Sequence, residues 1–323
     1  MMLMPVPVVV DADVLIRNVE YTIRKGWAGA LLGRASGGYS LASGVVLFAA
    51  ASAGGEAIRH LPEVAERQGV DLQMVRTTWN SLIVPNVRFV ALRDDAVSDP
   101  RIDGVHWKDV PTAILASLLA PAVLATDNRK HFRPFGLPDE IKTDAVAIDL
   151  YAVGQYGTGV NSAILVPRLS GAMVVEGAKK ASAKLGNDAV ALVGLVILGG
   201  FVLFLLSERG RSFRAKVGEA AREYGPPLME RVVEGIAASE RVGEFAIERV
   251  DEPNALAVLA RHLAVGQTMM STVDVAHELR RRRYSFRGGV RHETATRAWL
   301  VREPCFHEFQ HGHWSLGYQA AVL

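Results

Sequence analysis

Two short apolar runs each lead into an aspartate, and this pattern constrains the fold more than any other feature of the sequence. Residues 6–10 (VPVVV) are followed by Asp11, and residues 122–126 (AVLAT) are followed by Asp127. Short, continuous apolar runs are typical of strands that are buried on both faces, as in a parallel sheet covered by helices. Strand-like and helix-like stretches alternate over residues 1–150, which predicts an α/β domain with a parallel sheet flanked by helices.

A helix is expected between these two strands, and it also begins at an aspartate. Residues 109–119 read DVPTAILASLL, in which Asp109 suits a helix N-cap and Pro111 is tolerated in the first turn. In a parallel α/β sheet the carboxyl ends of strands and the amino ends of helices share one edge. We therefore expect Asp11, Asp109 and Asp127 to converge at that edge.

Converging carboxylates repel one another unless a cation lies among them. Oxygen ligands without cysteine or a required histidine suit Mg²⁺ or Mn²⁺. Such an ion activates water and stabilises the charge of a displacement at phosphorus. An aspartate at a strand end is often only a turn or cap residue, but three aspartates in this context favour a metal site.

These segments resemble the PIN domain, a metal-dependent ribonuclease fold. The resemblance lies in residues 8–15 (VVVDADVL), 109–119 and 122–132 (AVLATDNRKHF), and it covers residues 5–140. It implies that four acids bind the metal and carry the catalysis: Asp11, Glu56, Asp109 and Asp127.

The resemblance requires a glutamate from a helix between the first two aspartates. Glu56 fits that position best, and Glu63 and Glu66 compete with it. Asp13 is expected to help structurally or through a second metal. We expect His131 to be a surface or capping residue rather than a ligand.

The run of residues 189–206 (AVALVGLVILGGFVLFLL) carries no charged or polar side chain. At about 1.5 Å rise per residue such a helix nearly crosses a hydrocarbon core about 30 Å thick. We predict a transmembrane helix, with a fully buried core helix as the alternative. Residues 160–177 are a poorer second span, because Arg168 lies at their centre.

Residues 251–323 have the pattern of a separate small domain. Helices are expected at residues 253–263, 273–283 and 291–302, and a hairpin is expected around residues 310–312 (QHG). Ser271 or Thr272 is expected to cap the second helix, and Ala295, Ala298 and Trp299 are expected to face inward from the third. The ending, residues 306–317 (FHEFQHGHWSLG), resembles the wing of HARE-type winged helix-turn-helix domains.

Eight arginines and one acid, Glu293, lie between residues 280 and 302. Such a density of positive charge is what phosphate contacts need, although a solvated face or one that binds acidic lipid or protein has the same composition. We predict nucleic-acid contacts from Arg281, Arg287, Arg291 and Arg297. The histidines near the C-terminus are not expected to form a zinc cluster, because Cys305 is the single cysteine and a hairpin alternates its faces.

The sequence thus predicts a PIN-like nuclease domain (1–150), a helical connector (151–250) and a winged helix (251–323). The expected function is that of a metal-dependent endoribonuclease, and the alternative is a membrane-attached nucleic-acid-binding regulator with an idle PIN fold. Expected partners are substrate RNA, DNA at the winged helix, the membrane, and a second copy of the chain or an inhibitory protein. One cysteine and the lack of a signal at residues 1–10 indicate a cytoplasmic PIN domain, tethered to the membrane through residues 189–206.

Overall fold

The computed structural model describes residues 6–25, 45–137, 246–250, 254–266, 269–284 and 291–319. These residues belong to one compact unit, built from Met1–Gln155 and Gly235–Leu323. Both predicted spans, residues 160–177 and 189–206, lie outside the described residues, and so does Arg287. Within the described ranges, no helix is long and apolar enough to cross a membrane.

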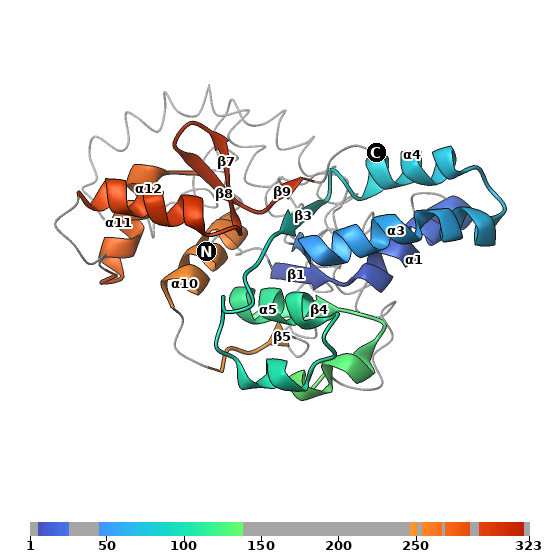
Figure 1. Ribbon diagram of the computed structural model, residues 1–323, viewed down its shortest axis with the longest axis horizontal. Helices are drawn as coiled ribbons and strands as arrows, with labels where there is room; N and C mark the ends of the chain where they lie inside the picture. The colour runs from blue at the N-terminus through green and yellow to red at the C-terminus, as the bar shows by residue number, and fades with distance from the viewer. Residues whose placement is uncertain are drawn as a thin grey trace, which may run out of the picture. The chain divides into compact units, whose positions relative to one another are not determined.

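A six-stranded sheet of order β5-β4-β1-β2-β3-β9 forms the centre of the unit (Figure 1). Its four inner strands are mutually parallel, as the sequence predicted: β1 (Val6–Val10), β2 (Val45–Ala50), β3 (Val87–Val90) and β4 (Ala122–Ala125). The edge strands β5 (Ala246–Ile247) and β9 (Tyr318–Gln319) are antiparallel to their neighbours. The strand order reverses between β1 and β4, which is where α/β sheets bind ligands.

Side chains of successive strand residues alternate between the two faces of the sheet. Val8 and Val10 of β1, with Leu47 of β2, pack on one face against α1 (Ala12–Lys25), α3 (Ala51–Gln68) and α4 (Leu72–Leu82) (Figure 1). Helix α3 lies close to the sheet because Gly54 has no side chain: a Cβ there would come within 2.3 Å of the Phe89 ring.

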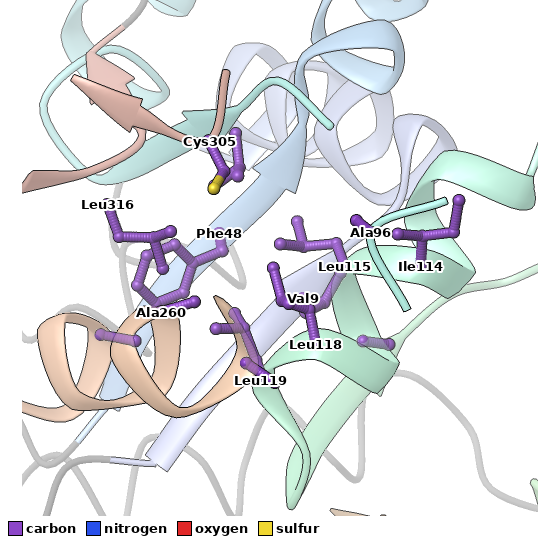
Figure 2. Close-up of a cluster of buried hydrophobic side chains, with 14 of the residues drawn as sticks. Val9, Phe48, Ala96, Ile114, Leu115, Leu118, Leu119, Ala260, Cys305 and Leu316 are labelled. Carbon is purple, nitrogen blue, oxygen red and sulfur yellow. The ribbon is translucent and has the colours of Figure 1, made fainter. Parts of the chain in front are cut away.

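The opposite face is covered by α5 (Val110–Leu119) and by α10 (Ala255–Gly266). Figure 2 shows the ring of Phe48, from β2, close to Ala260 of α10 and Leu316 near the C-terminus. Two 3-10 helices, η2 (Pro100–Gly104) and η3 (Arg129–Phe135), flank α5 and β4 in the sequence. Both faces of the sheet are therefore buried.

The C-terminal elements follow the order that the sequence predicted. After α10 come β6 (Met270–Ser271), α11 (Thr272–Arg281), α12 (His292–Arg302), β7 (Phe306–Gln310) and β8 (His313–Leu316). The three strands form an antiparallel sheet of order β6-β8-β7. Ser271 caps α11 by accepting a hydrogen bond from the Asp274 backbone. The Trp314 side chain is buried and donates from Nε1 to the Thr272 hydroxyl at 3.0 Å.

The predicted inward face of α12 is partly wrong. Ala298 is exposed, and the buried residues are Thr296 and Leu300, one turn apart. Thr296 can be buried because its hydroxyl donates to the His292 carbonyl at 2.8 Å. A small apolar residue therefore did not mark the inward face, whereas a threonine with a satisfied hydroxyl did.

Polar contacts also join the later part of the chain to the end of α5. Arg249 donates to the carbonyls of Leu118 and Ala120, and Arg261 donates to those of Leu119 and Pro121. These carbonyls lie at the end of α5, where a helix leaves its last acceptors unsatisfied. The sequence predicted that residues 1–150 and 251–323 form different domains, but in the structure they share one core.

This shared core predicts that both regions unfold together. Leu259→Ala in α10 removes a fully buried side chain and is expected to lower the free energy of unfolding by about 2–5 kcal/mol. Hydrogen exchange should then accelerate in β1 and β2 as well as in α10. Val273→Ala, at a largely exposed position of α11, is the matched control and should change little. Unchanged exchange in β1 after Leu259→Ala would contradict a common core.

Candidate metal centre

Asp11 lies at the carboxyl end of β1, beside the end of β4. Its backbone N–H donates to the Ala125 carbonyl at 3.1 Å, which continues the parallel pairing of Val10 with Ala125. Its carboxylate accepts a hydrogen bond from the Ala12 N–H at 2.8 Å and one from the Thr126 hydroxyl at 3.1 Å. Only 4% of the residue is exposed. The carboxylate is thus buried and fixed in orientation.

Burial is the largest cause that raises the pKa of Asp11, which reaches about 6. The hydrogen bonds from Ala12 and Thr126 lower this pKa, and the negative charges of Asp109 and Asp13 raise it. The contribution of Asp109 shows that its carboxylate lies near enough to Asp11 to repel it. A carboxylate in this state is stabilised by any cation that can reach it.

Asp109 stands at the N-cap of α5, as predicted, but its side chain makes no capping hydrogen bond. Its Oδ2 atom lies 2.7 Å from Nδ1 of His131 and 3.7 Å from Nδ1 of His106. The carboxylate is therefore directed toward two imidazole rings instead of toward the helix backbone.

Asn128 connects His131 to the β4 end. Its side-chain amide lies 2.7 Å from Nδ1 of His131, and its backbone N–H donates to the Thr126 hydroxyl at 3.0 Å. Thr126 in turn donates to Asp11. The Asn128 Nδ2 atom and the Asp109 Oδ2 atom thus lie at the same distance from one ring nitrogen. When protonated, Nδ1 donates to Asp109; when unprotonated, it accepts from the Asn128 amide.

Asp127 follows the end of β4, so it lies at the same sheet edge as Asp11. Its Oδ2 pairs with Nη1 of Arg17, from α1, at 2.9 Å. The Arg17 side chain is 67% exposed, whereas that of Asp127 is 11% exposed. An exposed arginine exchanges readily with solvent or with another cation.

Glu56 lines a cleft that contains none of the three aspartates. It projects from α3 into an open cleft between α1 and α3, which is also lined by Asp13, Arg17, Glu20 and Glu63. Its competitor Glu63 lines the same cleft and pairs with His60 at 3.0 Å.

Two histidines of this region were not predicted as ligands from the sequence. His131 was expected to be a surface or capping residue, yet the ligand atoms of His106, Asp109 and His131 all lie within 4.8 Å of one another. The rings of His106 and His131 stack, with centroids 4.8 Å apart. The available signal was weak: His106 is three residues before Asp109, and the turn that brings it back is closed by an Asp109 N–H to His106 carbonyl bond of 2.8 Å.

The predicted nucleic-acid-binding arginines differ in their surroundings. Arg281 makes a bidentate pair with Glu278, which lowers the pKa of that carboxyl to about 2. Arg297 pairs with Glu308 at 3.2 Å. Arg291 is exposed at the N-cap of α12, and no ion pair of Arg291 is found with a described residue. The charge of Arg291 is therefore the more available to a phosphate.

Comparison with models of protein families, with curated proteins and with solved structures finds no match to this chain.

The buried state of Asp11 predicts a pH-dependent stability. The folded chain holds the Asp11 proton up to about pH 6, and the unfolded chain holds it only to about 3.8. The contribution of Asp11 to stability therefore falls as the pH rises between these values, and its ionisation costs on the order of 2–3 kcal/mol at neutral pH. In EDTA, Asp11→Asn should raise the free energy of unfolding at pH 7.5 by up to this amount, and by much less at pH 4.5.

Urea unfolding at both pH values measures this difference. The exposed Asp94 gives the matched control, because Asp94→Asn should leave stability nearly unchanged at either pH. Equal effects of the two variants at pH 7.5 would show that Asp11 is not a strained, buried charge.

Proposed function

We propose that this chain is a PIN-type, metal-dependent endoribonuclease that carries a winged-helix module for nucleic-acid recognition. The observation that carries the proposal is the buried Asp11 carboxylate at the point where the strand order reverses, whose pKa the charge of Asp109 helps to raise. Asp127 follows the neighbouring strand at the same edge. A buried carboxylate with neighbouring acids at a ligand-binding edge is typical of a cation site.

The donor set fits Mg²⁺ or Mn²⁺, which prefer carboxylate oxygens. Asp11, Asp109 and Asp127 would hold such an ion, whose chemistry is to acidify a water and to stabilise charge at phosphorus. Residues of the chain orient and neutralise these carboxylates. Ala12 and Thr126 fix the orientation of Asp11, and the Arg17 guanidinium neutralises Asp127.

Glu56 as the fourth ligand stays a prediction: it lines the cleft between α1 and α3, which Arg17, the partner of Asp127, also lines. A site of three acids favours the second candidate function, a nucleic-acid-binding regulator with an idle PIN fold. The pairing of Asp127 with Arg17 and of Asp109 with His131 points the same way, since each pair compensates a charge that a metal would otherwise compensate.

The winged-helix part of the proposal is supported by the element order α10-β6-α11-α12-β7-β8. In such modules the third helix enters a groove of the nucleic acid, which makes α12 the expected reading helix. Because α10 is part of the sheet core, the module is attached to the nuclease-like part by packing as well as by the chain. The membrane tether at residues 189–206 and the cytoplasmic location remain predictions.

Cleavage by the full chain tests the proposal. With Mg²⁺ or Mn²⁺ the protein should cut single-stranded RNA, and Asp11→Asn should abolish cleavage while keeping the fold. Glu56→Gln makes the same acid-to-amide change at the fourth predicted acid: lost activity would assign Glu56 to the site, and retained activity would leave a site of three acids. Cleavage that persists in EDTA would contradict the metal mechanism. Binding of RNA or DNA without cleavage under any metal would favour the idle regulator.

The arginines allow a separate test of the recognition module. Arg291→Ala should weaken RNA or DNA binding and reduce the slope of log affinity against log salt by roughly 0.7–0.9 for each phosphate that is no longer neutralised. Arg281→Ala should weaken binding less, because Glu278 already compensates its charge. Gel shifts across a salt series measure both effects, and an unchanged slope for Arg291→Ala would show that Arg291 does not bind a phosphate.

A further inference from the structure

We propose that His106, Asp109 and His131 form a second metal site, for a divalent transition ion of the Zn²⁺ class. Its nearest ligand atoms lie within 4.8 Å of one another, and they come from the turn before α5, the N-cap of α5 and helix η3. The site lies beside the proposed Mg²⁺ centre, with which it shares Asp109, and its existence does not require that the chain be a nuclease.

The distances suit a shared ion once the two imidazoles approach each other. Zinc binds imidazole nitrogen and carboxylate oxygen at about 2.0–2.2 Å, which places neighbouring ligand atoms roughly 3.3 Å apart in a tetrahedron. The distances from Asp109 Oδ2 are 2.7 Å to His131 Nδ1 and 3.7 Å to His106 Nδ1, on either side of that value. All three ligand atoms lie within 4.8 Å of one another, so the imidazole nitrogens must close by up to about 1.5 Å, and the His106 side chain, which is 42% exposed, can make this movement.

The two rings are oriented by contacts with each other and with Asp109. The His106 and His131 rings stack at an interplanar angle of 24°, and the Nδ1 atoms of these rings lie 3.7 and 2.7 Å from Asp109 Oδ2. The Asn128 amide nitrogen lies 2.7 Å from the same His131 Nδ1 atom, so an ion bound there would displace this contact. Asn128 is itself held through Thr126.

The ligand types distinguish this site from the proposed Mg²⁺ centre. Two imidazoles and one carboxylate suit zinc and related ions, whereas Mg²⁺ prefers oxygen alone. Three protein ligands also leave one position open, and the partial exposure of His106 and His131 gives solvent access to it. The two centres therefore differ in which ion they select, and only Asp109 belongs to both.

Zinc titration of the full chain, in competition with a chromogenic chelator and without Mg²⁺, tests the inference. The wild type should bind one equivalent tightly. His106→Gln and His131→Asn should each weaken that binding by roughly 100-fold or more, because removal of a ligand exceeds the 10–100-fold effect of removing an outer partner. The double variant His311→Gln/His313→Gln also removes two imidazoles, from the exposed turn between β7 and β8, and should bind zinc as the wild type does.

A second readout does not depend on affinity. The Trp107 ring lies 5.9 Å from the His106 ring, so Co²⁺ in the site should quench tryptophan fluorescence, and Trp107→Phe should remove most of that quenching.

Asp127→Asn separates the two centres: it should spare zinc binding while abolishing Mg²⁺-dependent cleavage. Unchanged zinc binding in His106→Gln and His131→Asn would overturn the inference and leave an ordinary His–Asp hydrogen bond. Loss of zinc binding in His311→Gln/His313→Gln would overturn it by placing the ion at the turn.

Discussion

The packing of α10 against α5 and the second face of the sheet is the contact on which the rest of this structure depends. A parallel sheet needs cover on both faces, and residues 1–137 supply α1, α3 and α4 for one face but only α5 for the other. Helix α10 completes that second layer, and Arg249 and Arg261 satisfy the carbonyls at the end of α5. Because α5 carries Asp109 at its beginning, an element from residues 254–266 stabilises the helix that presents an acid of the candidate site.

This arrangement explains why Asp11 can be buried. Its neighbours in β1 and β4 are fully covered strands, so the first residue beyond the pairing is still largely out of solvent. Two hydrogen bonds compensate the carboxylate only in part, and its pKa stays raised. A fold that keeps a charge in this condition loses stability at neutral pH, and binding of a cation would restore that stability.

The sequence was most informative where a pattern was local. The apolar runs ending in Asp11 and Asp127 predicted neighbouring parallel strands, and the order of elements after residue 254 was also correct. Docking of α10 was not predictable in this way, because its apolar residues look the same whether they cover a small domain or a distant sheet.

Long-range partners were missed for the same reason. Nothing near Asp109 in the sequence indicates His131, twenty-two positions away, or that Arg17 would pair with Asp127. Glu56 was assigned to the site only because it lies on a helix between Asp11 and Asp109 in the sequence. That position does not determine whether its side chain points toward the carboxyl ends of the strands.

Two of the three aspartates already have partners in the chain. Arg17 pairs with Asp127, and His131 hydrogen-bonds Asp109. Asp11 is bound differently, because the Ala12 and Thr126 groups that donate to its carboxylate are neutral. The free-energy gain from a cation should therefore be largest at Asp11 and smaller at the other two, where an existing ion pair or hydrogen bond must first be broken. Mg²⁺ would be stabilised mainly by the Asp11 carboxylate, whereas zinc would bind the imidazoles that lie next to Asp109. If an ion binds at this edge, its identity would depend on how easily the Arg17–Asp127 pair and the His131–Asp109 hydrogen bond are broken.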